Sequence, residues 1–314
     1  MTYSSGGLIQ AADFNGFAGT SQTGNGATIN QIWGIGTGNC GYGQTPIATV
    51  AGPTPGPPDT VAATNWAALI NTLNIIRNHQ SGAGSGISAP TAGSTVTYLS
   101  TLSSAISTAY SSRNSYATTG TDITSTKALS MSATASVAAS ASQTWTVTFG
   151  SVDQCRYFFN AGGHIFIYYG TFTNTGATAR GTSINTLCQT NYTYKVLYAN
   201  SMSSRQGTGG TVVTDTTGTG YYALPTVATQ YLRINSTSYY SGDYCYLNVN
   251  TNGGAGSYGA NGNIITLTFG AYSATTGSTQ PSDAISITQN MICYVRQPET
   301  STGLSNSWGT PTIA

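Results

Sequence analysis

The spacing of apolar residues changes along the chain, from a helical period in the first third to a strand period afterwards. Between residues 62 and 76, apolar side chains recur every three or four positions, which places them on one face of an α-helix. That face comprises Ala62, Trp66, Leu69, Ile70, Leu73 and Ile76. Asp59 or Thr60 can cap the start of this helix, and the glycine-rich stretch 81–86 ends it.

A second helix is expected from about residue 97 to residue 116. An apolar stripe with the same spacing runs along it and comprises Leu99, Leu102, Ile106 and Tyr110. Two helices joined by a Gly/Ser/Pro segment can pack as a hairpin or enter a helical bundle between subunits. Residues 59–120 are therefore predicted to form a helical attachment and oligomerisation region, with Trp66, Leu69 and Leu73 as candidate contacts.

Residues 1–58 are expected to form an extended arm rich in glycine and proline. The part before the prolines lacks a periodic apolar pattern, and isolated aromatic residues such as Phe14, Phe17 and Trp33 interrupt it. The proline run at 53–58 is stiff, because proline fixes its own backbone and cannot continue a helix. We therefore predict that the aromatic side chains of the arm dock onto another surface and take part in assembly.

From residue 143 onward the pattern is that of β-strands. At its start Trp145, Val147 and Phe149 alternate with threonines, which is the period of a strand with one buried face. Further strands are predicted at 164–169, 192–198, 230–235, 244–250, 263–269 and 284–296. Residues 121–314 are therefore predicted to form an antiparallel β-sandwich-like domain. The fold class is mainly β with an α-helical N-terminal part, and residues 117–142 are either strand or linker.

Charged side chains are rare, which narrows the possible classes of function. Asp, Glu, Lys and Arg make up 5% of the residues, against roughly 25% in an average soluble protein. Nine scattered Lys and Arg residues cannot build the basic patches that bind nucleic acid or anionic membrane surfaces. No apolar run approaches the ~20 residues that span a bilayer, and the first ten residues lack a secretory signal pattern. We expect a protein that folds in the cytosol, with no nucleic acid bound and no membrane insertion, whose neutral surfaces are buried in an assembly.

Few side chains are suited to catalysis or metal binding. The five cysteines are far apart without a CxxC spacing, so we predict free thiols and no metal site. The G-x-G-x-x-G match at 36–41 precedes a proline run instead of a helix, so no cofactor is expected. The eight carboxylates are spread along the chain, and no G-x-S-x-G elbow occurs. We therefore predict no catalytic residues, and we place His79 at the surface of a helix end and His164 at a strand edge.

A short helix is predicted over residues 151–160, with a capping serine first and a glycine pair after its end. Asp153 near its start suits the helix dipole and can pair with Arg156, about one turn further on. The next three residues can seal the end of a sheet with a dense aromatic cluster: Tyr157, Phe158 and Phe159. We interpret all five as structural residues and not as a ligand site.

Two stretches resemble structural proteins of tailed bacteriophages, especially the phages of marine cyanobacteria. The first is GTGNCGYGQT at 36–45, together with VAATNWAAL at 61–69 and the helix that follows. The second is the string D-Q-x-R-Y-F-F-N-x-G-G at 153–163, with Cys155 where a small residue is usual. This string recurs in phage proteins described as virion structural or tail-fibre-like. The resemblance implies a non-enzymatic virion protein of the tail, baseplate or tail fibre, assembled in the host cytoplasm.

The leading hypothesis is a homo-oligomeric virion subunit that contacts copies of itself and other virion proteins. Trimers or sixfold-related rings match phage tail symmetry by analogy. The alternative is a receptor-binding module for host surface glycans, because tyrosine faces beside Asn, Ser and Thr can stack on and hydrogen-bond to neutral sugars. Tyr239 and Tyr240 are the candidate glycan contacts, and the tyrosine pairs at 221–222 and 168–169 share the same pattern. A capsid-decorating protein and a polysaccharide-degrading tailspike are less favoured.

Overall fold

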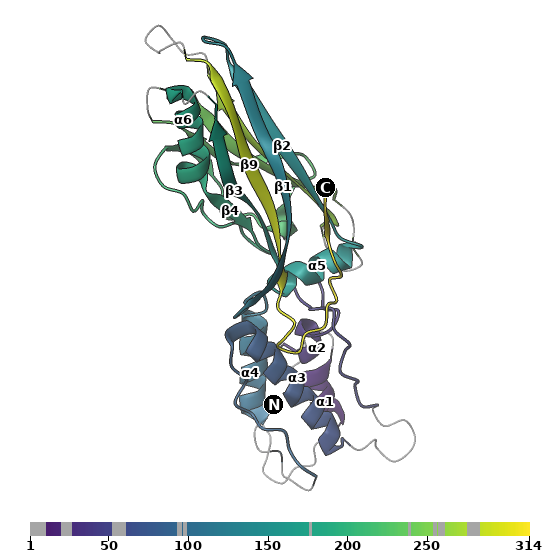
Figure 1. Cartoon of the computed structure of the whole chain (residues 1–314). Helices are drawn as coiled ribbons and strands as arrows, with labels where there is room; N and C mark the ends of the chain where they lie inside the picture. Colours follow the sequence, from purple (N-terminus) through teal and green to yellow (C-terminus); the bar gives the residue numbers. More distant parts are fainter. Residues whose placement is uncertain are drawn as a thin grey trace.

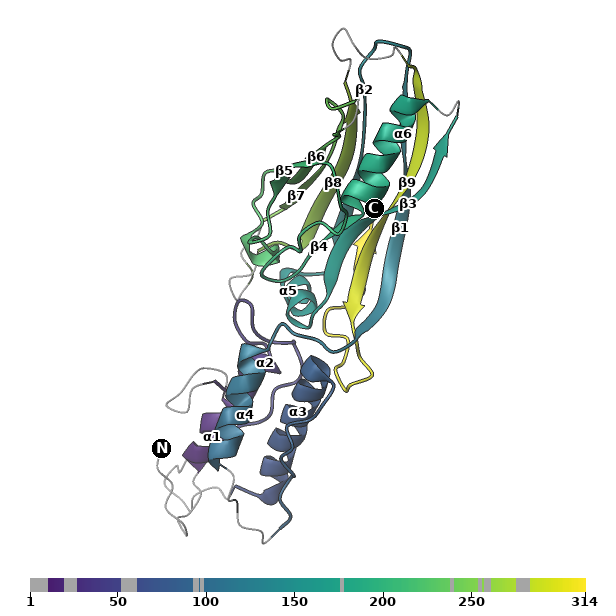
Figure 2. The same cartoon turned by 90° about the vertical axis from the view of Figure 1, so that its left-hand side faces the viewer.

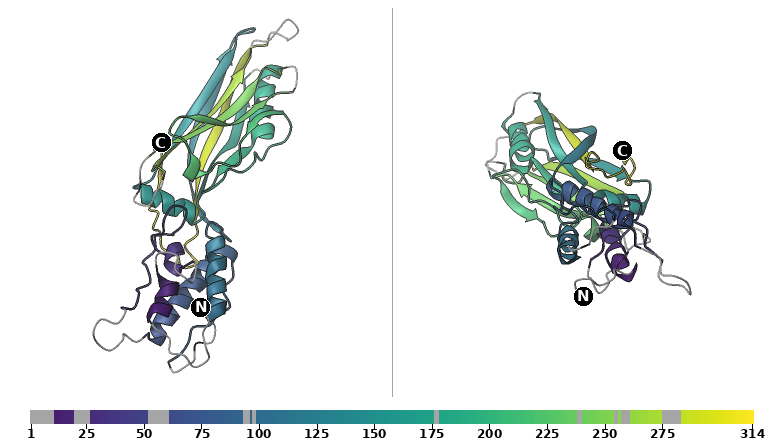
Figure 3. Two further views of the ribbon diagram at one scale, coloured as in Figure 1. Left: turned by 180° about the vertical axis from the view of Figure 1, so that it is seen from behind. Right: turned by 90° about the horizontal axis from the view of Figure 1, so that it is seen from below.

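Helices occupy one end of an elongated molecule and strands occupy the other (Figure 1). The computed structural model describes residues 11–19, 27–51, 61–92, 96, 99–175, 178–237, 240–253, 256, 261–274 and 283–314. The chain passes from the helical end into the strands after α4, and a late loop returns to the helical end before the C-terminus (Figure 3). The two ends are therefore joined by more than one crossing of the chain.

The helical end is built from α1 (Ala11–Ala18), α2 (Ile29–Ile32), α3 (Ala63–Ser81) and α4 (Leu99–Ser111). Both predicted helices are confirmed, although the second ends at Ser111. Their apolar stripes are buried except for Ala62, which is exposed before the start of α3, and Tyr110, which is half-buried. The predicted caps Asp59 and Thr60 lie outside the described residues. Instead, the side chain of Asn65 accepts a hydrogen bond from Ala62 N at 2.9 Å. Gly82 ends α3 in the left-handed conformation, with a φ of +75°.

The prediction of an extended arm over residues 1–58 is wrong for its described part. Short helices form there, and Phe14 and Phe17 pack on Trp66 with ring centroids 5.3 and 6.1 Å apart. The two phenylalanines are three positions apart, so one helical face carries both of them. They complete the core of this chain instead of docking onto another surface. The proline run at 53–58 lies outside the described residues.

Two antiparallel sheets face each other in the other end of the molecule (Figure 2). Their strand orders are β1-β9-β3-β4 and β10-β2-β8-β7-β6-β5. The strands are β1 (Thr119–Ala133), β2 (Ala139–Thr148), β3 (His164–Asn174), β4 (Tyr194–Leu197), β5 (Thr211–Asp215), β6 (Thr229–Asn235), β7 (Tyr244–Thr251), β8 (Ile264–Ser273), β9 (Ile285–Pro298) and β10 (Thr312–Ile313). Alternate residues such as Trp145, Phe269 and Val295 are fully buried. The mainly β, sandwich-like fold class is confirmed.

Several elements were not predicted. α6 (Ala179–Thr186) and the π-helix η1 (Leu187–Tyr192) run between the two sheets along one side of the sandwich (Figure 2). They carry few large apolar residues, and the buried ring of Tyr192 reaches within 4.7 Å of the ring centroid of Phe269. The edge strand β5 was also missed, because its valines are exposed and give no alternating burial pattern. Residues 117–142, for which the sequence allows strand or linker, hold all of β1 and the start of β2.

All five cysteines are buried and free, as predicted from their spacing. Burial raises the pKa of the Cys293 thiol to about 12, so this group stays protonated at neutral pH. In the described part of the chain, no helix combines the length and the apolar character needed to cross a membrane.

Candidate functional site

The short helix α5 (Val152–Asn160) lies where the two ends of the molecule meet (Figure 1). Ser151 caps it by accepting a hydrogen bond from Gln154 N at 3.1 Å. Asp153 pairs with Arg156 at 3.4 Å across one turn. The predicted cap and the predicted ion pair are therefore both confirmed.

The Arg156 guanidinium holds the backbone of the glycine-rich loop 35–43. Its Nη2 donates to Ile35 O and its Nη1 to Cys40 O, both at 2.6 Å, and the side chain is fully buried. Asn160 donates to carbonyls of the same loop at 2.9 and 3.0 Å. Buried carbonyls need donors, and a charged donor makes the stronger bond. The G-x-G-x-x-G match therefore forms a structural loop, and we call Arg156 and Asn160 the glycine-loop clamp.

The aromatic residues of α5 pack on both sides of this junction. Phe158 and Phe159 are buried against Phe149, with ring centroids 5.0 and 6.4 Å apart. Tyr157 covers Gly43, where an added Cβ would lie 2.4 Å from the tyrosine ring. These contacts connect the bottom of the sheets to the glycine-rich loop, as expected for residues with a structural role.

The remaining assembly candidates lie in the helical end, apart from α5. Those that are buried in this chain's own core are Phe14, Phe17, Trp66, Leu69 and Leu73. Trp33 is half-buried, and its indole Nε1 donates to Thr45 O at 2.9 Å.

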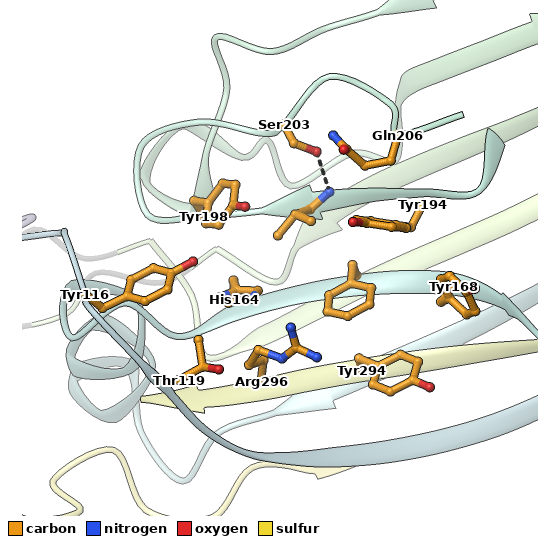
Figure 4. Close-up of a pocket in the computed structure, with 12 residues that line it drawn as sticks. Tyr116, Thr119, His164, Tyr168, Tyr194, Tyr198, Ser203, Gln206, Tyr294 and Arg296 are labelled. Carbon is orange, nitrogen blue, oxygen red and sulfur yellow. Dashed lines mark hydrogen bonds between the residues drawn. The ribbon is translucent and has the colours of Figure 1, made fainter. Parts of the chain in front are cut away.

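An aromatic groove on the outer face of the β1-β9-β3-β4 sheet is the candidate binding site (Figure 4). Its volume is about 560 Å³. The tyrosines that line it are Tyr116, Tyr168, Tyr194, Tyr198 and Tyr294. Ser203 and Gln206, from the loop after β4, form one rim, and Arg296 of β9 lies near its centre (Figure 4).

Strand register brings the groove residues together. The period of a strand places His164, Phe166 and Tyr168 on the outer face of β3, and Phe166 is aligned with Tyr294 of β9. These two rings stack with centroids 4.9 Å apart and planes 6° apart. Tyr168 and Tyr194 face each other at 5.9 Å. Phe166 is 7% exposed and Tyr168 is 38% exposed, so phenylalanine forms the floor and tyrosines form the accessible walls.

The ionisable groups in the groove carry no unbalanced charge. Arg296 binds both carboxylate oxygens of Asp122, at 2.8 and 2.9 Å. Burial lowers the pKa of His164, so this ring is neutral at pH 7. Burial and the adjacent Tyr198 raise the pKa of Tyr116 to about 12. Stacking and neutral hydrogen bonding are therefore the interactions that this surface supports.

The prediction that His79 lies at the surface is wrong. Its side chain is 1% exposed, because the end of α3 is covered by the turn that follows α5. Its ring Nε2 lies 3.0 Å from Ala161 O and donates to it in the Nε2–H tautomer. Burial lowers the pKa of His79 to about 4. His164 is also buried, at 4% exposure, although it sits at the start of a strand as predicted.

The carboxylates in the sandwich and the C-terminal loop each take part in local structure. The pairs are Asp122–Arg296, Asp153–Arg156, Asp215–Lys195, Asp243–Ser273, Asp283–Tyr240 and Glu299–Ser301. Within the residues that the structure describes, no group of three or more His, Cys, Asp or Glu side chains could hold a metal ion.

One of the two predicted glycan contacts is buried, and the other lies outside the described residues. Tyr240 is 5% exposed, and its hydroxyl donates to Asp283 Oδ2 at 3.0 Å, so its ring offers no face to a sugar. Tyr239 is the residue outside the described part of the chain. Of the other tyrosine pairs, 221–222 belongs to the junction, and 168–169 contributes Tyr168 to the groove.

The other groove residues were missed for a specific reason. Alternation within the predicted strands 192–198 and 284–296 places Tyr194 with Tyr198, and Tyr294 with Arg296, on one face. The sequence therefore indicates which of these residues share a face of a strand. Whether the face points outward, and which strands are neighbours, depends on pairings between distant segments that periodicity does not reveal.

Comparison with known proteins found no relative for this chain. No protein-family model, curated protein or solved structure matches it. The resemblance to phage virion proteins therefore rests on the two quoted stretches alone. Any further inference about function depends on the geometry of the folded chain.

Proposed function

We propose that this chain is a non-enzymatic structural protein of a tailed-phage virion, associated with the tail, baseplate or tail fibre, and that it acts through protein–protein assembly. The observation that carries the proposal is the open edge of the six-stranded sheet. Among the strands that the structure describes, β5 pairs only with β6, and its Val212 and Val213 are 43% and 55% exposed. An edge strand with one open side and exposed apolar side chains is a surface on which another chain can dock.

The near absence of charge supports the same proposal. Soluble monomers usually block edge strands with charged side chains, and they keep a net charge that disperses them. Here charged residues are 5% of the chain and the net charge is +1. A molecule that is locked between neighbours in a particle does not need that repulsion.

The elongated shape also fits a projecting particle component. The helical end carries the resemblance at 36–45 and 61–69, and α5 carries the second string. One end can attach to a particle while the sandwich at the other end packs or projects (Figure 1). Attachment by one end and packing or projection by the other are both part of the proposal.

The mass of the purified full chain in solution tests the assembly part of the proposal. Sedimentation equilibrium should give a trimer or a hexamer of the 32.3 kDa chain. Val213→Lys should shift the mass toward the monomer, because a lysine on the edge would have to lose its hydration in the interface. Val137→Lys is the matched control, since Val137 is 50% exposed in the turn between β1 and β2.

Two results would contradict the proposal. One is a monomer at every concentration tested, with no change on Val213→Lys. The other concerns location: antibodies against the chain should label purified phage particles, and particles that contain none of it would exclude the virion role.

A second function, recognition of host surface glycans by the same virion protein, is favoured by the aromatic groove. It needs an accessible platform of tyrosines with neutral polar groups beside it, which is what lines the outer face of the β1-β9-β3-β4 sheet.

A further inference from the structure

We infer that the aromatic groove binds a neutral oligosaccharide, with Tyr168 and Tyr294 stacking on sugar rings and Gln206 and Ser203 contacting sugar hydroxyls. This inference rests on the second function proposed above and specifies its ligand class and its contact residues. It replaces the Tyr239–Tyr240 hypothesis, which the burial of Tyr240 removes.

The tyrosine rings are held in place before any ligand arrives. Tyr294 lies parallel to Phe166, and Tyr168 meets Tyr294 edge-on with centroids 6.2 Å apart and planes 85° apart. Tyr168 also contacts Tyr194. Aromatic side chains that are already ordered lose little conformational entropy on binding. The walls of the groove are therefore preorganised for stacking on the apolar faces of sugar rings.

Polar groups line the rim where sugar hydroxyls would lie. Ser203 Oγ accepts a hydrogen bond from Val196 N at 2.9 Å, which leaves its hydroxyl proton to donate outward. Gln206 is exposed on the same loop beside Ser203 (Figure 4), and its Nε2 donates to Ser204 O at 3.1 Å, which leaves its oxygen and its second amide hydrogen for a ligand. An amide offers both a donor and an acceptor, which is the pattern that matches vicinal hydroxyls.

The charges in the groove favour a neutral ligand over an acidic one. An anionic sugar would have to compete with Asp122 for Arg296, whose guanidinium already binds that carboxylate at two points. His164 is buried and its pKa is lowered by that burial, while burial raises the pKa of Tyr116 to about 12, so neither of these groups adds a charge at pH 7. The volume of about 560 Å³ lies within the roughly 300–1,000 Å³ typical of small-ligand sites, whereas a protein partner would need a larger apolar area.

The experiment uses the purified full chain on an array of neutral and acidic oligosaccharides, followed by calorimetric titration. The calorimetric probes are cellohexaose and maltohexaose as neutral sugars and the galacturonate hexamer as the acidic one. We expect a neutral sugar to bind and the acidic one to bind at least ten times more weakly. Tyr168→Ala should weaken binding about ten-fold, and Gln206→Ala by a few-fold. Tyr168→Phe should keep most of the affinity, because the ring remains.

Tyr272→Ala is the matched control. Tyr272 is a half-buried tyrosine on the outer face of the opposite sheet, so its removal should leave sugar affinity unchanged. Three results would overturn the inference: no neutral sugar binds, the acidic hexamer binds more tightly, or Tyr168→Ala has no more effect than the control. Sugar binding by a chain that is absent from particles would refute only the virion role, and assembly without sugar binding would refute only this inference.

Discussion

At the scale of single residues, His79 and Asp243 are buried groups whose pKa values move in opposite directions. Burial lowers the pKa of His79 from 6.5 to about 4. Between pH 6.5 and about pH 4 the folded protein therefore holds fewer protons than the unfolded chain, and its stability falls as the pH drops through this range. Burial raises the pKa of Asp243 from 3.8 to about 6. That group makes stability fall as the pH rises from 3.8 to 6, so the two effects oppose each other in the wild type.

His79→Gln separates these effects, because the glutamine amide can still donate to Ala161 O but does not titrate. Relative to the wild type, the free energy of unfolding of this variant should rise on the order of 2–3 kcal/mol between pH 7 and pH 4. Urea unfolding followed by tryptophan fluorescence at pH 7, 5.5 and 4 measures the difference. A difference that does not change with pH would show that His79 does not titrate below its ordinary range.

Asp243→Asn should show the opposite trend under the same conditions. The wild type regains stability when Asp243 is protonated, and the variant cannot do so. The variant should therefore become less stable than the wild type on acidification from pH 6 to pH 4, by about 2 kcal/mol. Ser273 Oγ and Ala274 N remain as donors to the asparagine oxygen, so the local contacts are matched.

At the scale of elements, the glycine-rich loop and α5 form one unit. Gly41 has a φ of +91°, and an added Cβ would lie 2.2 Å from Ile35 O, a backbone atom that cannot move aside cheaply. Gly38 also has a positive φ, of +51°, but an added Cβ would meet nothing within 4 Å. Alanine substitutions at Gly41 and Gly38 therefore separate two reasons for glycine: close packing against the backbone, and a positive φ alone.

Gly41→Ala should cost at least about 3 kcal/mol of unfolding free energy, and Gly38→Ala about 1–2 kcal/mol, because the second variant adds only left-handed strain. Urea midpoints of the two variants measure the difference. Equal losses would mean that the loop is not held closely against its own backbone and the glycine-loop clamp.

At the scale of the whole molecule, the helical end and the sandwich are joined by buried contacts. Besides the glycine-loop clamp and His79, the side chain of Gln44 donates to Ser305 O at 2.9 Å and accepts from Ser305 N at 2.8 Å. Trp308 nearby is 1% exposed. We therefore expect one calorimetric unfolding transition for the full chain.

Arg156→Lys should uncouple the two ends. Three different nitrogens of Arg156 contact Asp153, Cys40 O and Ile35 O, and the single nitrogen of a lysine cannot occupy all three positions. Scanning calorimetry should show two separated transitions for the variant. Two transitions in the wild type, or one unshifted transition in the variant, would contradict this view of the junction.

Interactions between residues that are close in the sequence could be predicted from the sequence alone. The helices α3, α4 and α5, the Ser151 cap, the Asp153–Arg156 pair and most strands all follow from spacing over one or two turns or from simple alternation. α1 was missed because its few apolar residues stand among small and polar ones. β5 was missed because it has no buried face.

Amino-acid order alone was sufficient for the mainly β class, the helical N-terminal part and the near-neutral surface, because periodicity, caps and composition are local properties. Only the folded chain decided the binding surface. The groove joins Phe166, Tyr194 and Tyr294 from three strands, and pairing across long loops sets their register. The same long-range packing buries His79 and Tyr240, which their local sequence did not indicate.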